Sequence, residues 1–222
     1  GFKVAHIKTD SIKIPDATPE IIQFTMDFGK QYGYEFEHEA TYDRMCLVND
    51  AVYIAKYPNG KWTATGTQFQ VPYVFKKLFS KEELIFDDMC ETKSVTSTLY
   101  LDMNESLPEG EHNYQFIGKV GRFCPIKEGC GGGVLYREKE GKYYAATGSK
   151  GYRWLESEMV AELGKQDDID HKFYISLVDA AKETIQKYGD FEWFVSDDPY
   201  VGPIMIEGEY GLHPFYDEDI PF

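Results

Sequence analysis

The sequence predicts an α+β protein, in which an antiparallel sheet carries helices on one face and a mixed α/β domain follows. Three patterns indicate this class. Residues 3–14 place apolar residues on both sides of a polar cluster, Lys8-Thr9-Asp10-Ser11, which is typical of two strands joined by a tight turn. Residues 18–33 have the period of an amphipathic helix. Residues 61–66 return from the turn Pro58-Asn59-Gly60 as the second strand of a hairpin.

The first helix is predicted to begin after Thr18 and to end at Gly33. Thr18 is a favourable N-cap, Pro19 fits the first helical position, and Glu20 suits the positive end of the helix dipole. Gly33 is a typical residue just after a helix, because it accepts a left-handed backbone conformation. Apolar residues spaced by three and four positions between these ends predict one buried face.

Strands are expected after this helix. Residues 34–42 alternate aromatic and acidic side chains, which predicts a half-buried strand, and residues 44–57 predict another. Pro72 predicts the start of a further helix, and Ser80 with Glu83 has the spacing of a capping box. The domain change is placed after Asp88, which gives domains of residues 1–88 and 89–222.

The second domain is expected to begin with strands and to end with helices. The predicted elements are strands near residues 95–101 and 112–126, a hairpin turn at 140–142, a short helix at 156–163, and a long helix that starts after Asp167 or Asp168 and reaches Lys187. An acidic tail rich in Gly and Pro begins at Ser196.

The composition limits the possible functions. The 222 residues include 38 acidic and 23 basic side chains, so the net charge is −15. This balance counts against a free-standing nucleic-acid-binding protein, because binding to phosphates needs a surface of Lys and Arg. No run of about 18 apolar residues is present, so no membrane span is expected. The chain does not begin with Met, and we interpret it as a segment of a longer, cytoplasmic protein.

The cysteines and the glycine run each leave two interpretations open. Cys124 and Cys130 are separated by five residues, which is wide for a zinc site, so reduced thiols are the simpler expectation. The run Gly131-Gly132-Gly133 could hold a phosphate through its backbone N–H groups or simply form a tight turn. No Lys-Ser/Thr pair follows the run, which favours the turn.

The residues 6–11 resemble motif C of the family B DNA polymerases, a Tyr-Gly-Asp-Thr-Asp-Ser hairpin in the palm domain. Thr9, Asp10 and Ser11 match the motif, whereas His6 replaces its Tyr and Lys8 its first Asp. The order of the elements that follow is also similar, so the resemblance covers about the first 80 residues. It implies the end of a phage-like polymerase palm, followed by a thumb-like domain.

The resemblance implies that Asp10 is a catalytic residue and a ligand of Mg²⁺, with primer–template DNA and a dNTP as partners in the complete polymerase. The family carries a Lys-Lys-Arg-Tyr cluster in a later strand, and here only Tyr53 matches it. Residues expected to contact DNA, from the resemblance and from basic residues placed near aromatic ones, are Lys8, Thr9, Ser11, Tyr53, Lys56, Lys76, Lys77, Arg122 and Arg153.

Two parts of the family's catalytic machinery have no counterpart in this sequence. One is the motif A carboxylate, which lies upstream of motif C in the family, and the other is the basic fingers helix that holds the triphosphate. We therefore expect the chain alone to lack polymerase activity and to depend on the remaining polymerase domains. The alternatives are an ordinary Asp-Ser turn, and a non-enzymatic domain of the same fold that binds nucleic acid or protein. Lys8 could contact the primer backbone or pair with Asp10.

Overall fold

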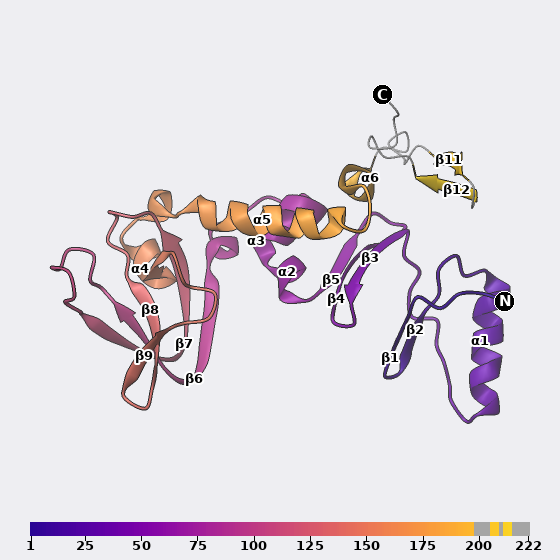
Figure 1. Cartoon of the computed structure of the whole chain (residues 1–222), viewed down its shortest axis with the longest axis horizontal. Coiled ribbons are helices and arrows are strands. Elements are labelled where there is room, and N and C mark those ends of the chain that lie inside the picture. The colour runs from indigo at the N-terminus through magenta and orange to yellow at the C-terminus, as the bar shows by residue number, and fades with distance from the viewer. Residues whose placement is uncertain (198–204, 209–210, 215–222) are drawn as a thin grey trace. The chain divides into compact units, whose positions relative to one another are not determined.

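A computed structural model describes residues 1–197, 205–208 and 211–214 (Figure 1). It has an α+β fold with antiparallel sheets, which confirms the predicted class. The chain forms two compact units, which we describe separately. Unit 1 contains residues 1–69 and 192–222, and unit 2 contains residues 70–191. The units divide between Phe69 and Gln70, whereas the sequence analysis placed a domain change after Asp88; the palm-like and thumb-like assignment stays a prediction.

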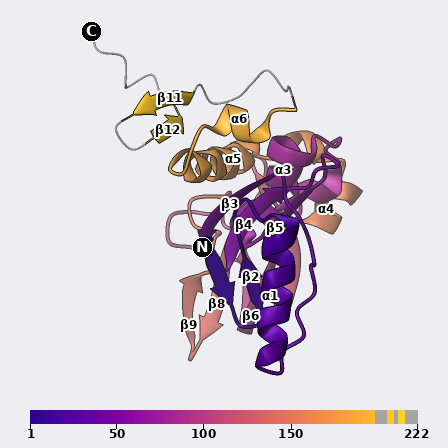
Figure 2. The ribbon, with the colours of Figure 1, turned by 90° about the vertical axis from the view of Figure 1, so that its right-hand side faces the viewer.

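Unit 1 begins with the expected hairpin and helix. Strands β1 (His6–Lys8) and β2 (Ser11–Lys13) pair antiparallel with Ile7 opposite Ile12. Helix α1 (Pro19–Gln31) follows, and Figure 2 shows it beside the hairpin. The Thr18 hydroxyl accepts a hydrogen bond from the backbone N–H of Ile21, and Gly33 adopts a φ of 80° just after the helix. Both predicted helix ends are therefore confirmed.

The second sheet of unit 1 is a three-stranded meander of β3 (Arg44–Asn49), β4 (Val52–Lys56) and β5 (Trp62–Thr65). The hairpin around Gly60 is confirmed, with Gly60 at a φ of 84°. The single strand predicted over residues 44–57 is wrong, because the Asn49 side chain accepts a hydrogen bond from Ala51 N at 2.9 Å and turns the chain there.

The strand predicted over residues 34–42 is also wrong. This segment has no regular secondary structure, and its aromatic residues pack one at a time instead of along a common face. Phe36 lies against Gly29 of α1, where a Cβ atom at position 29 would come within 2.4 Å of the ring. Tyr42 packs on Tyr53 and Tyr57. The alternating pattern therefore reflects separate contacts.

Unit 2 is built on a five-stranded antiparallel sheet with the order β10-β7-β6-β8-β9. Its strands are β6 (Glu91–Asp102), β7 (Tyr114–Ile126), β8 (Val134–Lys139), β9 (Lys142–Ala145) and β10 (Arg153–Glu156). The predicted turn between β8 and β9 is confirmed, with Glu140 and Gly141 both at positive φ. Short helical segments precede the sheet: α3 (Pro72–Phe75), η1 (Lys76–Ser80) and η2 (Phe86–Met89).

Helices follow the sheet: α4 (Ser157–Glu162), η3 (Gln166–Asp168) and α5 (His171–Gln186). The long helix was predicted to start after Asp167 or Asp168, but those residues lie in η3. Asp170 is the N-cap, and its carboxylate accepts a hydrogen bond from Lys172 N at 3.0 Å. The core of unit 2 includes the fully buried side chains of Leu99, Phe123 and Trp154.

The chain passes between the units in α2 (Thr67–Gln70) and α6 (Phe191–Val195). Strands β11 (Met205–Gly208) and β12 (Gly211–Pro214) form a hairpin near the end of the chain. Most of the predicted acidic tail lies outside the described residues. Within the described part of the chain, no helix has the length and apolar character needed to cross a membrane.

Candidate functional site

The candidate site is the tip of the β1–β2 hairpin. Lys8 and Ser11 form its last strand pair, so Thr9 and Asp10 make a two-residue turn. Thr9 adopts a φ of 46°, which is a genuine outlier for a β-branched residue. Ser11 Oγ donates a hydrogen bond to the Lys8 carbonyl at 3.3 Å and ties the two sides of the turn together. The Asp10 side chain is consequently presented to solvent on a constrained turn.

A tyrosine cluster holds the base of the hairpin. The Lys13 ammonium lies 5.4 Å from the ring centroid of Tyr53 and 6.0 Å from that of Tyr42. Tyr42 also packs on Tyr57, with ring centroids 5.1 Å apart. Burial raises the pKa of the Tyr42 phenol, and the neighbouring phenols of Tyr53 and Tyr57 raise it further. Tyr53, expected to contact DNA, thus contributes to the internal packing beneath the hairpin.

His6 faces the interior of unit 1. Its side chain is only 9% exposed, and its Nε2 atom lies 3.8 Å from the Asp50 carboxylate. Neither ring nitrogen has a hydrogen-bond partner among the described residues. The Asp50 contact links β1 to the turn between β3 and β4.

The structure gives Asp10 no companion ligand from the described part of this chain. No group of three or more His, Cys, Asp or Glu side chains that could hold a metal occurs within residues 1–197, 205–208 and 211–214. Lys8 is exposed and forms no ion pair with Asp10 there. A single carboxylate does not make a Mg²⁺ site, because Mg²⁺ requires several oxygen ligands in octahedral geometry. Any metal site at this hairpin needs additional donors.

Lys56 is the predicted DNA contact that is least accessible. Its side chain is buried on β4, and its ammonium donates to the Asp197 carboxylate at 2.6 Å and to the Ser196 carbonyl at 3.1 Å. Arg44 on the neighbouring strand donates to the carbonyl groups of Trp193 and Ser196. These contacts fasten the segment after α6 to the meander, so a phosphate would have to displace a carboxylate to reach Lys56.

Predicted DNA contacts in unit 2 are also paired with acidic side chains. Lys76 Nζ lies 2.9 Å from the buried Asp88 carboxylate, and Arg122 lies 2.7 Å from Asp87 in the same short helix. Arg122 has a raised pKa because its guanidinium donates to Asp87. Lys77, by contrast, is exposed. The sequence shows the basic residues but not these long-range partners.

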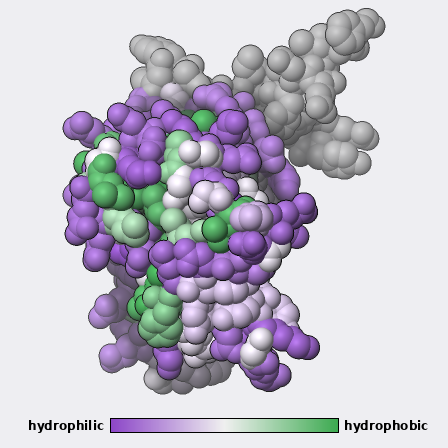
Figure 3. Space-filling model, turned by 90° about the vertical axis from the view of Figure 1, so that its left-hand side faces the viewer, coloured by the Kyte–Doolittle hydropathy of each residue, from purple (hydrophilic) through white to green (hydrophobic). Residues whose placement is uncertain are grey.

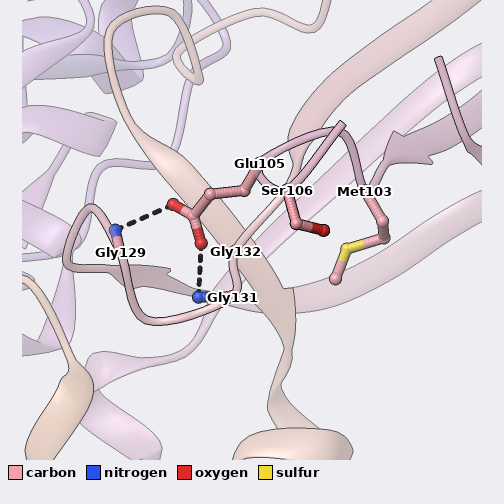
Figure 4. A pocket seen from close by; sticks show the side chains of 6 residues that line it. All are labelled: Met103, Glu105, Ser106, Gly129, Gly131 and Gly132. Carbon is pink, nitrogen blue, oxygen red and sulfur yellow. Dashed lines mark hydrogen bonds between the residues drawn. The ribbon is translucent and has the colours of Figure 1, made fainter. Parts of the chain in front are cut away.

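The glycine run is closed by an internal carboxylate, a contact that the sequence analysis missed. Glu105 accepts hydrogen bonds from Gly129 N at 2.9 Å and from Gly131 N at 2.5 Å (Figure 4). Arg153, predicted to bind DNA, lies 3.0 Å from the same carboxylate and donates to the Gly132 carbonyl. Within the glycine run, the Gly131 N–H therefore already holds a carboxylate, and the Gly133 N–H donates to the Trp154 carbonyl.

A shallow pocket of about 270 Å³ lies beside this clamp, lined by Met103, Ser106 and the glycines together with Glu105. Its only charged lining side chain is Glu105, which is already engaged with the loop. The hydrogen bonds from Gly129 and Gly131 to Glu105 join residues that lie 24 and 26 positions apart, so no local sequence pattern predicts them. This arrangement makes the loop a rigid structural element.

One face of α1 is uncovered in unit 1. Phe24, Phe28 and Tyr32 follow one another at four-residue spacing, and all three are exposed. Their rings form a continuous row with Phe2, at centroid separations of 5.1 to 6.0 Å. A helix normally buries its apolar stripe, so this exposed row is an unusual apolar patch on the surface of unit 1.

Comparisons of the chain with protein-family models, with curated proteins and with solved structures gave no significant match.

Proposed function

We propose that this chain is the palm and thumb part of a DNA-directed DNA polymerase of the family B type, and that it is inactive alone. The observation that carries the proposal is the hairpin: Asp10 lies exposed on a two-residue turn with a strained Thr9, inside a sequence that resembles motif C. Strained backbone persists where the surrounding structure enforces it, and it is concentrated at functional sites.

In the proposed function, Asp10 contributes one carboxylate to a Mg²⁺ site that other polymerase segments complete. Bound Mg²⁺ would supply charge stabilisation for the transferred phosphoryl group. Thr9 fixes the turn, Ser11 closes it, and Lys13 anchors it on the tyrosine cluster. Primer–template DNA, a dNTP and the remaining polymerase domains are the proposed partners. The exposed aromatic row of α1 supports this, because a larger palm would cover it.

The proposal includes a cytoplasmic location. All four cysteines are free thiols in the structure, which is compatible with a reducing compartment.

The metal role of Asp10 is tested with Mn²⁺, whose unpaired electrons broaden NMR signals even when binding is weak. We expect Mn²⁺ to broaden the amide signals of residues 9–11, and the variant Asp10→Asn to lose this effect. The matched control is Asp16→Asn, since Asp16 is another exposed carboxylate of unit 1 at a positive φ of 50°, a conformation that Asn tolerates. Equal broadening in wild type and Asp10→Asn would contradict the assignment.

The predicted lack of activity is tested by primer extension. The isolated chain should not extend a primer in the presence of Mg²⁺ and dNTPs, because one carboxylate supplies too few ligands to hold two metal ions. Measurable extension that Asp10→Asn abolishes would show that the chain is complete as an enzyme.

A second candidate function is a non-enzymatic binding domain. The observation that favours it is the pairing of four predicted DNA contacts with carboxylates: Lys56, Lys76, Arg122 and Arg153. The Mn²⁺ experiment separates the two candidates. A non-enzymatic binding domain does not use a metal at Asp10, so Mn²⁺ should then not broaden the signals of residues 9–11 selectively.

A further inference from the structure

Two cysteines of unit 2 face each other across neighbouring strands. Glu91 of β6 pairs with Phe123 of β7, and one position further along the two strands lie Cys90 and Cys124. Cys90 has an extended backbone, with a φ of −117° and a ψ of 109°, so it continues the direction of β6. The two Sγ atoms lie 3.6 Å apart. The strand register and the contact between the thiols therefore agree that the two cysteines are directly opposite.

This arrangement suits a disulfide bond. Opposite residues of an antiparallel pair have Cα atoms about 4.5 or 5.5 Å apart, and disulfides join Cα atoms about 4.4–6.8 Å apart. The Sγ atoms must approach from 3.6 Å to a bond length of about 2.0 Å. Cys90 can make this move because it lies one residue before β6, at the end of η2, where its N–H donates to the Asp87 carbonyl at 3.3 Å.

The two thiols differ in their access to solvent. Cys124 is fully buried, whereas Cys90 is partly exposed. Burial raises the pKa of both thiols, and the nearby Arg122 guanidinium opposes this rise. A positive charge beside a thiol favours the thiolate, which is the form that attacks a disulfide. A small oxidant therefore reaches Cys90 first, and Cys124 is placed to complete the bond.

The surface of unit 2 suits a water-soluble oxidant. Figure 3 looks onto the unit 2 end of the chain, where hydrophilic side chains surround separate hydrophobic patches. Oxidised glutathione is a small hydrophilic disulfide, and the glutathione pool sets the redox state of thiols in reducing compartments.

We propose that Cys90 and Cys124 are a redox-active pair, which forms a reversible disulfide bond by exchange with a low-molecular-weight disulfide such as oxidised glutathione. The Cys90 thiolate attacks one sulfur of the oxidant, whose S–S bond breaks and releases one glutathione thiolate. The Cys124 thiolate then attacks Cys90 Sγ, forms the protein disulfide and releases the second glutathione. The two protein thiols lose two protons and two electrons, and the oxidant becomes two molecules of thiol. The pair goes beyond the proposed function, because it does not depend on Asp10 or on catalysis.

The bond is expected to be reversible. The Cβ atoms of opposite residues lie about 4.5–5.5 Å apart, whereas a disulfide prefers about 3.8 Å, so the bond must draw the two strands together. Disulfides that strain their surroundings are reduced more easily than relaxed ones. In the oxidised chain, the bond would fasten the junction of η2 and β6 to β7.

The test equilibrates the reduced full chain for several hours with mixtures of reduced and oxidised glutathione in the absence of air, and acid then stops the exchange. Intact mass gives the number of hydrogen atoms lost, and peptide mapping without reduction locates the bond. We expect the loss of two hydrogen atoms and a cross-link between Cys90 and Cys124, and excess reduced glutathione should restore both thiols. Absence of this cross-link after equilibration with oxidised glutathione alone would overturn the proposal.

Variants identify the pair. Cys90→Ser should form no protein disulfide. The matched control is Cys130→Ser, because Cys130 is the other partly exposed cysteine, and this variant should form the bond as wild type does. Cross-links from Cys130 to either member of the pair, at the same yield as the Cys90–Cys124 bond, would show unselective oxidation and would overturn the assignment.

A comparison of folded and unfolded chains tests the role of the fold. In urea the two cysteines only close a flexible loop, for which effective concentrations are about millimolar. In the folded chain the Sγ atoms are already in contact, so the effective concentration of one thiol at the other, measured against glutathione, should be at least about tenfold higher. An equal or lower value in the folded chain would mean that the fold does not favour the bond, and it would overturn the proposal.

Discussion

Tyr174 of α5 gives a sharp test of the core of unit 2. Its side chain is fully buried and its ring stacks on Tyr73, with centroids 4.6 Å apart. The hydroxyl, however, has no hydrogen-bond partner among the described residues. An unsatisfied buried polar group costs about 1–3 kcal/mol. The variant Tyr174→Phe keeps the ring stack and removes the orphan hydroxyl, so we expect its free energy of unfolding at pH 7 to rise by about 1 kcal/mol.

The same substitution should change the response to alkaline pH. Burial raises the pKa of the Tyr174 phenol in the folded state, whereas in the unfolded chain it ionises near pH 10. A group with a raised folded-state pKa contributes its full stability below the unfolded value and loses it as the pH rises. At pH 11, ionisation of the unfolded phenol should cost wild type about 1.4 kcal/mol that Tyr174→Phe does not lose. The advantage of the variant should therefore grow from pH 7 to pH 11.

Urea unfolding followed by the fluorescence of Trp154, which is fully buried in unit 2, measures this difference. Replacing Trp62 and Trp193 of unit 1 by Phe in both proteins isolates the signal. Tyr144→Phe is the control, because Tyr144 is exposed and its replacement should not change stability at either pH. Destabilisation of Tyr174→Phe by more than about 1 kcal/mol at pH 7 would show that the hydroxyl has a partner and would refute the reasoning.

Two further predictions concern the loops and the thiols. Glu105→Ala should remove two charge-assisted hydrogen bonds and lower the free energy of unfolding of unit 2 by about 2–4 kcal/mol. The amides of Gly129 and Gly131 should selectively lose their protection against hydrogen exchange. In the control variant Ser106→Ala, both amides should stay protected. At pH 8, a thiol reagent should modify Cys46, Cys90 and Cys124 slowly, because burial raises the pKa of all three, to about 11 for Cys46. Denaturation in urea should equalise all four cysteines, and fast labelling of Cys46 in the native chain would contradict its burial.

Local patterns in the sequence predicted the local parts of the fold. The Asp10 hairpin, the Thr18 cap and the Gly60 turn each depend on residues within a few positions of one another, and all three are present. The strand predicted over residues 34–42 failed because a strand needs a partner, and the alternating pattern carries no information about one. Asp170 was not predicted as the N-cap of the long helix, because Asp167 and Asp168 fit the same sequence pattern.

The candidate site was predictable to a smaller extent. Asp10 could be placed at a turn from its neighbours, but the tyrosine cluster under the hairpin joins residues 13, 42, 53 and 57, which only the fold brings together. The carboxylate partners of Lys56 and Arg153 lie 141 and 48 positions away. A basic residue in a sequence therefore indicates charge, and whether that charge is free for a ligand depends on long-range contacts.

This distinction fixes the expected salt dependence of nucleic-acid binding. The affinity for a single strand falls with salt at a slope of about −0.7 for each phosphate neutralised. A cation that is already paired with a carboxylate, such as Lys56 with Asp197 at 2.6 Å, only exchanges one anion for another when it binds a phosphate. Such an exchange does not add to the release of counterions that sets the slope. Among the predicted DNA contacts, the exposed cations without a carboxylate partner in the described part of the chain are Lys8 and Lys77. The slope for a single-stranded oligonucleotide should then be about −1.4. A slope near −4 or steeper in wild type would mean that phosphates displace the paired carboxylates. The ion-paired cations Lys56, Lys76, Arg122 and Arg153 would then also contact the nucleic acid.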